Sequence, residues 1–333
     1  MYKKINRYFQ DNKLPKFRIK QLEEFVFKQF VSSFDEMTTF SKDLREQLNE
    51  KFSLFTLSLI ETKKTKDTIK FVFKTEDNNY IESVLMLHDK RRTVCVSSQI
   101  FCTMGCKFCA TGAKPFKRNL TVEEIVEQVL FISQYLKKKD ERVSNIVYMG
   151  MGEPFMNYDN VIESIKIFNN RDKFDIGARH IVISTCGIIP RIKEFMNLNL
   201  QVRLAISLHA ANDELRSSLM PINKQYPLKN LIKVCDQFTE RTNKKVSYEY
   251  VLIRDVNDSE KDAKELVQLL KGKLVHVNLI VYNPHDFAKF GRPSQSVVSN
   301  FKNVLDRNRI ECSIRRSMGD EISGACGQLA GKK

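Results

Sequence analysis

Three cysteines in one short run of the sequence have the spacing of a metal-binding loop. Cys102, Cys106 and Cys109 occur in FCTMGCKFCATG, as Cys-x3-Cys-x2-Cys with no fourth cysteine in the run. A structural zinc site requires four closing ligands, which this triplet does not supply. Iron–sulfur clusters are held by cysteine thiolates, and a [4Fe–4S] cluster with three protein ligands leaves one iron free to bind a chelating molecule. We therefore expect such a cluster at this loop.

Small and polar residues follow several strand-like segments further along the chain. Gly152 and Glu153 come after NIVYMG. There a glycine lets the backbone approach a ligand closely, and a carboxylate can hold a cationic amino group. Other polar residues after later strand-like segments are Ser184, Ser207, His209 and Asn283. Each alone is also typical of an ordinary strand end, but together they predict a ring of donors and acceptors around one cofactor site.

The elements that must position these residues alternate between strands and helices from about residue 92. Strand-like runs occupy 93–98, 145–150, 180–185, 202–208, 246–253 and 274–282, and helical patterns occupy 121–139, 160–170, 189–197, 228–241 and 259–272. Such alternation is typical of parallel strand pairing. Six βα units predict an α/β fold with an open or partial barrel, whose chemistry collects on the loops after the strand C-terminal ends.

The first part of the chain has a different pattern. We expect residues 1–85 to form a small accessory domain and residues 86–333 to form the core with its C-terminal segment. The run 15–52 predicts two or three short amphipathic helices, one of which Ser33 or Asp35 could cap. The run 68–87 predicts a β-hairpin with its turn at residues 77–79.

The composition indicates a folded protein with a basic surface. Lys and Arg number 55 against 40 Asp and Glu, a net charge of +15. This excess attracts phosphate backbones and favours a nucleic-acid partner, although a lysine-rich genome would also produce it. No run approaches the roughly 20 apolar residues of a membrane helix, and the N-terminus lacks the apolar core of a signal peptide. We expect a cytoplasmic protein without a membrane partner.

The remaining cysteines divide into two groups. In a reducing compartment, clustered cysteines more often bind metal or do chemistry than form disulfides. Isolated cysteines usually pack as small core residues, and we expect this of Cys186, Cys235 and Cys312. Cys326 lies in the glycine-rich run SGACGQLAG, and Cys95 lies in the first strand of the core. By spacing alone these two are unrelated thiols.

Six segments together resemble a known family, the RlmN and Cfr radical S-adenosylmethionine (SAM) methyltransferases of ribosomal RNA adenine. The resemblance extends over nearly the whole chain, including FRIKQLEEFVFK, which looks like the family's small RNA-binding domain. It implies a partial (β/α)6 radical SAM barrel, with a [4Fe–4S] cluster and SAM as cofactors. The segments are CVSSQIFCTMGCKFCATG, GMGEPFMN, ISTCGIIP, AISLHAANDELRSSLMPIN, YVLIRDVND and GACGQL.

The resemblance also implies roles that the spacing leaves open. Cys326 matches the cysteine that is first methylated, and Cys95 matches the thiol that forms a transient disulfide with it. Glu82 matches the carboxylate that accepts a proton. The positions that match SAM contacts are Gly152, Glu153, Ser184, Ser207, Leu208, His209 and Asn283.

The implied substrate is an adenosine in the peptidyl-transferase centre of 23S rRNA, methylated at C2, and in some members also an adenosine beside the tRNA anticodon. An electron donor such as flavodoxin would reduce the cluster, and we expect a monomer. Pro154 in GMGEP is similar to the C2-methylating enzymes. Three alternatives stay open: a C8-methylating antibiotic-resistance enzyme of the Cfr type, a non-catalytic RNA-binding protein with zinc or a cluster, and a radical SAM enzyme that activates a protein.

Overall fold

One continuous twisted sheet contains both the N-terminal antiparallel strands and all the strands of the barrel. The computed structural model describes residues 2–198 and 200–331. In this part of the chain the main sheet has ten strands in the order β1-β2-β3-β4-β7-β8-β9-β10-β11-β12. Strands β5 (Gln99–Ile100) and β6 (Arg118–Asn119) form a separate antiparallel pair.

The first four strands of the main sheet are antiparallel. They are β1 (Ser58–Lys64), β2 (Thr68–Lys74), β3 (Tyr80–Leu87) and β4 (Arg92–Cys95). The expected hairpin is confirmed as β2 and β3, and its turn includes Asn78 with a positive φ of 61°. Strand β1 was not expected, because its side chains are mostly exposed and lack the alternation of a half-buried strand.

From β4 onward every pair of neighbouring strands is parallel, as the alternation predicted. The strands after β4 are β7 (Asn145–Tyr148), β8 (Ile181–Thr185), β9 (Arg203–Ser207), β10 (Val246–Leu252), β11 (Val275–Val281) and β12 (Cys312–Arg315). The six expected strands are present, so the partial (β/α)6 barrel is confirmed. The sequence analysis missed the last unit, which consists of helix α10 (Gln295–Arg307) and β12.

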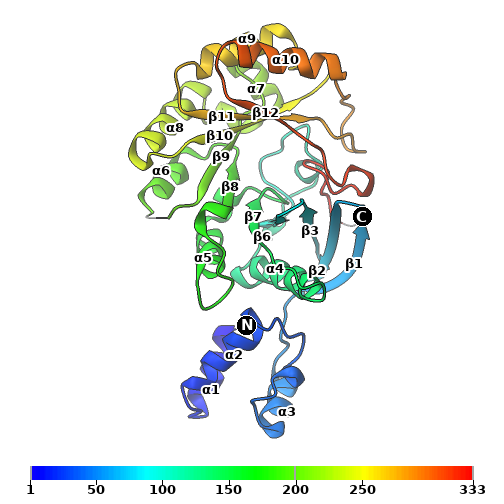
Figure 1. The fold of residues 1–333 in the computed structure, drawn as a ribbon, viewed down its shortest axis with the longest axis vertical. Coiled ribbons are helices and arrows are strands. Elements are labelled where there is room, and N and C mark those ends of the chain that lie inside the picture. The colour runs from blue at the N-terminus through cyan, green and yellow to red at the C-terminus, as the bar shows by residue number, and fades with distance from the viewer. Residues whose placement is uncertain (1, 199, 332–333) are drawn as a thin grey trace.

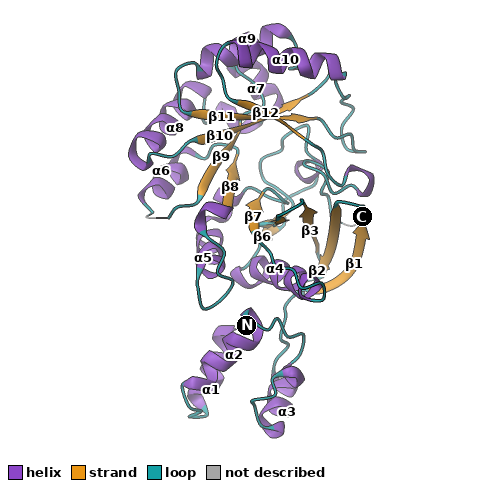
Figure 2. Cartoon of the chain, viewed as in Figure 1, coloured by secondary structure: helices purple, strands orange, loops and turns teal. Residues whose placement is uncertain are grey.

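Helices cover the outside of this curved sheet (Figure 2). Thr121 caps α4 and Ser259 caps α9, each in a reciprocal capping box with the residue three positions later. Both caps therefore stabilise the N-terminus of a helix, where the chain leaves a loop and enters the outer layer. The helices of this layer that precede α10 are α4 (Val122–Lys137), α5 (Tyr158–Asn169), α6 (Ile189–Asn197), α7 (Asp213–Leu219), α8 (Leu228–Thr242) and α9 (Glu260–Leu270).

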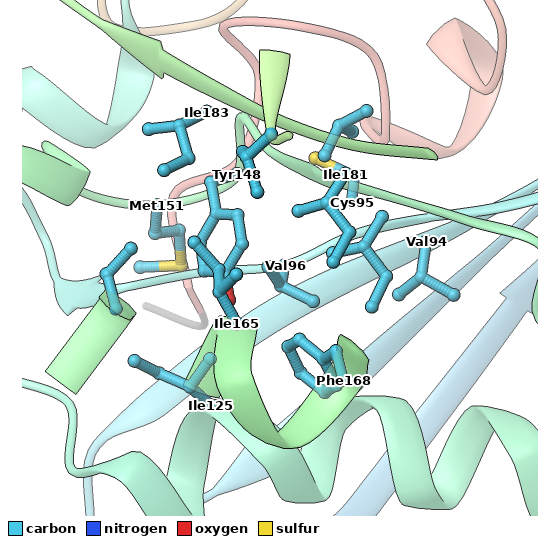
Figure 3. Close-up of a cluster of buried hydrophobic side chains, with 14 of the residues drawn as sticks. Val94, Cys95, Val96, Ile125, Tyr148, Met151, Ile165, Phe168, Ile181 and Ile183 are labelled. Atoms are coloured by element: carbon cyan, nitrogen blue, oxygen red, sulfur yellow. The ribbon is translucent and has the colours of Figure 1, made fainter. Parts of the chain in front are cut away.

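Apolar side chains fill the space between the sheet and these helices (Figure 3). Val94 of β4 and Ile181 of β8 are fully buried, as are Ile125 of α4 and Phe168 of α5. The buried Tyr148 hydroxyl is hydrogen-bonded to Ser164 at 2.6 Å, so its polar atom is satisfied. This packing holds the strand ends, and therefore the loops that follow them, in fixed positions.

Three helices precede the sheet: α1 (Tyr2–Asp11), α2 (Phe17–Phe27) and α3 (Lys42–Lys51). They lie at the lower end of the view, below α4 and α5 (Figure 1). The expected cap at Ser33 or Asp35 was wrong. Ser41 caps α3 by accepting the Leu44 N–H at 3.3 Å, whereas Ser33 precedes only a single 3-10 turn and caps nothing with its side chain.

The domain boundary expected after residue 85 stays a prediction. Strands β3 and β4 pair across it, so the hairpin is hydrogen-bonded to the first barrel strand. In the described ranges, no helix combines the length and the apolar character that crossing a membrane requires.

Candidate active site

The loop that carries the three cysteines is closed at its base by the β5–β6 pair. Within it, the Lys107 N–H donates to the Leu219 carbonyl at 3.0 Å, and the Ala110 N–H donates to the Gly327 carbonyl at 2.8 Å. These bonds attach the loop to the end of α7 and to the C-terminal segment. Cys102, Cys106 and Cys109 all line one cavity at the mouth of the barrel.

The chemistry of these three thiols fits an iron–sulfur cluster. Burial raises the pKa of Cys102 to about 12 and that of Cys106 well above its usual value. Bound iron would reverse this effect, because metal ions bind and stabilise thiolates. Among the described residues, no three His, Cys, Asp or Glu side chains lie close enough together to bind one shared metal ion. A [4Fe–4S] cluster does not require such an arrangement, because each cysteine thiolate binds a different iron atom.

Gly152 and Glu153 lie beside the cysteines, as expected. Gly152 has φ +98°, and a Cβ there would stand 2.5 Å from the Gln99 Cβ. The Glu153 carboxylate is buried and accepts the backbone N–H groups of Phe155 at 2.9 Å and Cys186 at 2.8 Å. Burial raises its pKa, and these two donors oppose that rise. A carboxylate has four lone-pair sites, so Glu153 keeps acceptor capacity toward a bound ammonium group.

Three further expected residues line the same cavity: Ser184, Ser207 and His209. The two serine hydroxyls lie 3.4 Å apart. Burial lowers the pKa of His209 to about 3, so its imidazole is neutral at physiological pH. Its Nδ1 accepts the Val251 N–H at 3.0 Å, which assigns the proton to Nε2. His209 therefore offers a neutral N–H donor to a ligand.

Leu208 and Asn283 are placed differently from the other five expected SAM contacts. Neither side chain lines the cavity. The Leu208 carbonyl accepts from the Arg216 Nε at 3.1 Å, and the Asn283 Nδ2 donates to the Cys326 carbonyl at 3.2 Å. Asn283 thus fixes the segment that carries Cys326.

Arg216, which the sequence analysis missed, is fully buried and also donates to the Cys186 and Ser207 carbonyls, at 2.8 and 3.1 Å.

Cys326 faces the same cavity as the three cluster cysteines, although it is separated from them by more than 200 residues. Part of the residue is exposed, but loss of hydration around its thiol raises the pKa, an effect that the Arg315 guanidinium opposes. Arg315 and Glu249 line the cavity and are joined by an ion pair of 3.3 Å. Neither was expected, because Arg315 ends the short strand β12 and Glu249 lies inside the apolar run of β10.

Cys95 ends strand β4 and is buried, which raises the pKa of its thiol to about 12. A charge interaction with the Cys326 thiol also contributes to that rise. The structure does not contain the expected disulfide: all eight cysteines are free.

Glu82 lies outside this cavity, in strand β3, which is adjacent to β4. Its Oε1 is paired with Lys70 at 3.0 Å, and its Oε2 accepts the N–H groups of Ala330 and Gly331 at 2.9 and 3.1 Å. Each carboxylate oxygen thus already has a partner within the chain. Of the cysteines expected in the core, Cys235 and Cys186 are buried, but Cys186 also lines the cavity, and Cys312 is only half-buried.

The barrel, the three-cysteine loop and the ring of polar residues define a radical SAM enzyme. Residues 96–267 match the Radical SAM superfamily, and residues 1–54 match the ribosomal RNA large subunit methyltransferase N-terminal domain. A solved radical SAM methyltransferase from Sphaerobacter thermophilus superposes with a TM-score of 0.95 and 41% identity, over 99% of this chain and 97% of that one. The expected fold is thereby confirmed.

Two sequence relatives specify the family. The chain is 46% identical to the probable dual-specificity RNA methyltransferase RlmN of Dictyoglomus turgidum, over 95% of this chain and 90% of that protein. It is also 46% identical to the protein of the same name from Staphylococcus aureus strain JH9, over 96% of this chain and 88% of that protein. The chain belongs to the RlmN family of radical SAM RNA methyltransferases, with SAM and a [4Fe–4S] cluster as its cofactors.

Proposed function

We propose that this enzyme methylates C2 of an adenosine in the peptidyl-transferase centre of 23S rRNA, and also an adenosine beside the tRNA anticodon. The two relatives are named dual-specificity RNA methyltransferases, and the net charge of +15 suits an RNA substrate. The observation that carries the mechanism is the position of Cys326, which shares one cavity with the three cluster cysteines.

Adenine C2 lies between two ring nitrogens and is electron-poor, so it cannot attack the electrophilic methyl group of SAM. A cysteine thiolate can, and Cys326 is the exposed thiol of this cavity. Its proton must leave first, and the Arg315 guanidinium favours the charged thiolate. When bound, the cluster and SAM supply the methyl group and the radical chemistry that activates it toward the RNA base.

Release of the product requires a second thiol and a base. We assign the proton of adenine C2 to the Glu82 carboxylate and the attack on the Cys326 sulfur to Cys95. The Cys95 thiolate forms the Cys95–Cys326 disulfide and breaks the bond between sulfur and the RNA-linked CH2 carbon. That carbon keeps the bonding electrons and takes up a proton, which makes it the new methyl group. An external reductant then restores both thiols. Because Glu82 is bonded to Ala330 and Gly331, its role requires the C-terminal segment to shift.

The cofactor contacts divide among the remaining residues. We assign the SAM ammonium group to Glu153 and the other polar groups of SAM to Gly152, Ser184, Ser207 and His209. Leu208 and Asn283 would contribute through their backbone or by holding neighbouring groups. An electron donor such as flavodoxin would reduce the cluster, and we expect the enzyme to act as a cytoplasmic monomer.

Mass mapping of RNA tests this proposal against C8 methylation. The anaerobically reconstituted enzyme is incubated with SAM, a reductant and a 23S rRNA fragment, and the modified nucleoside is compared with authentic C2- and C8-methyladenosine. We expect C2-methyladenosine from the rRNA fragment and from a tRNA anticodon stem-loop. C8-methyladenosine as the main product, or no product with intact iron and SAM binding, would contradict the proposal.

A further inference from the structure

The cavity that Cys326 and the three cluster cysteines line is called the catalytic cavity. A second cavity of about 430 Å³ opens beside it. It lies between the loop after β11 and the end of the C-terminal segment, and Lys114, His285 and Phe287 are among its lining residues. The two cavities adjoin: the His285 Nε2 is 3.0 Å from the carbonyl oxygen of Phe108, which lines the catalytic cavity. A molecule that enters the catalytic cavity therefore passes close to this one.

Of the Lys and Arg side chains that line this second cavity, two form ion pairs with carboxylates, and the third, Lys114, can bind an anion from outside the chain. Lys70 is paired with Glu82 at 3.0 Å, and Arg292 is paired with Asp320 at 2.6 Å. Lys114 differs, because its Nζ donates to the Ala330 carbonyl at 3.0 Å and no carboxylate of the described residues is within ion-pair distance.

The Lys114 ammonium also lies over two aromatic rings, 5.1 Å from the centroid of Phe101 and 5.6 Å from that of Phe287. These rings restrict the position of the lysine head group. Asp286, which is exposed at the same rim, carries a negative charge. The Asp286 charge disfavours an extended polyanion at this rim, so the lining suits a single phosphate near Lys114.

One of the two rings under this cation, Phe287, is exposed, and a second exposed aromatic residue, Phe116, follows Lys114 by two positions in the chain. Phe287 is 39% exposed and Phe116 is 38% exposed, and both lie in loops that also carry the exposed Lys117 and Lys289. Single-stranded nucleic acid is typically bound by this combination, in which bases stack on aromatic faces while cations meet the backbone. An RNA base must also be unstacked or unpaired before it can enter a closed catalytic cavity.

We propose that Phe287 and Lys114 form a binding subsite for an unpaired nucleotide next to the target adenosine. The base of that nucleotide stacks on the exposed face of Phe287, and its phosphate contacts the Lys114 ammonium. The subsite deepens the proposed function and rests on it, because it requires an RNA substrate. Its chemistry is not specific for one base, so it positions the strand without reading its sequence.

Equilibrium binding of a labelled single-stranded RNA that contains the target adenosine tests the subsite, because binding is measured separately from methylation. Phe287→Ala should weaken binding about five- to a hundredfold, the effect expected when a stacked base loses its aromatic partner, and Phe287→Tyr should restore most of it. Lys114→Gln should lower the slope of log K against log salt concentration by about 0.7, the value for one phosphate of a single strand.

Matched controls lie on other faces of the barrel. Leu274→Ala removes a side chain that is 50% exposed, and Lys193→Gln removes an exposed charge on α6. Both controls should bind RNA as the wild type does, and iron content and SAM affinity verify that each variant is folded. Wild-type affinity and salt slope in Phe287→Ala and Lys114→Gln would overturn the subsite. Tight RNA binding with no C2 methylation by the wild type would instead overturn the proposed function.

Discussion

Replacement of Glu153 should separate SAM binding from cluster binding. The buried carboxylate accepts the N–H groups of Phe155 and Cys186. In Glu153→Gln one amide NH2 faces a backbone donor, so one buried N–H loses its acceptor at a cost of about 1–3 kcal/mol in stability. The variant also loses the charge-assisted hydrogen bond that we assign to the SAM ammonium group, worth about 1.5–3 kcal/mol. That loss corresponds to a roughly ten- to hundredfold weaker affinity.

The assay compares iron content, SAM affinity and thermal unfolding in anaerobically reconstituted protein. We expect Glu153→Gln to keep its iron, to bind SAM ten- to a hundredfold more weakly and to unfold at a lower temperature. Glu163→Gln is the matched control, because the Glu163 side chain on α5 is 53% exposed and forms its ion pair with Lys166 on the same helix. If iron content fell as sharply as SAM affinity, or if SAM affinity did not change, the assignment of Glu153 to the ammonium group would be wrong.

Three further predictions test separate parts of the structure. Cys106→Ala should abolish reductive SAM cleavage, because the cluster needs all three thiolates; cleavage by an iron-free variant would refute this. Gly152→Ala should lower both stability and SAM affinity, since its Cβ would stand 2.5 Å from Gln99, whereas Gly272→Ala, also at positive φ, meets nothing within 4 Å and should keep wild-type SAM affinity. Burial raises the pKa of Glu127 from 4.5 to about 8, so the folded state keeps a proton that the unfolded state releases near pH 4.5. The stability from this group is therefore complete below that pH and is lost as pH rises through 8, by roughly 1 kcal/mol per pH unit. The unfolding free energy of Glu127→Gln should lack this decline, and parallel curves for both proteins from pH 5 to 8 would contradict it.

Short-range patterns predicted the elements whose signals are local. The hairpin turn at residues 77–79 depends on residues that are adjacent in the chain, and it was placed correctly. The three cysteines of the cluster loop are also close in sequence, and they line one cavity. Ser33 and Ser41 show the limit of such signals, since both are good capping residues and the sequence does not show which one precedes a continuing helix. The exposed strand β1 lacks the apolar alternation that would have identified it.

The contacts that complete the catalytic cavity depend on tertiary structure. The C-terminal segment is attached to the cluster loop by the Thr111 hydroxyl, which donates to the Leu329 carbonyl across 218 positions of sequence. No periodicity reveals such a contact, so the pairing of Cys95 with Cys326 came from family resemblance alone. Arg315 and Glu249 meet because β12 and β10 both flank β11, which a strand as short as β12 does not predict.

The Cys95→Ala variant tests the methyl-relay mechanism most directly. Without the Cys95 thiol, Cys326 can still be methylated and joined to the RNA, but nothing remains to attack its sulfur and release the product. We expect labelled RNA to stay covalently attached to Cys326 on a denaturing gel, with the linkage located by nuclease digestion and peptide mass spectrometry. Cys312→Ala is the control and should turn over normally. Normal turnover by Cys95→Ala, or by Cys326→Ala, would contradict the mechanism.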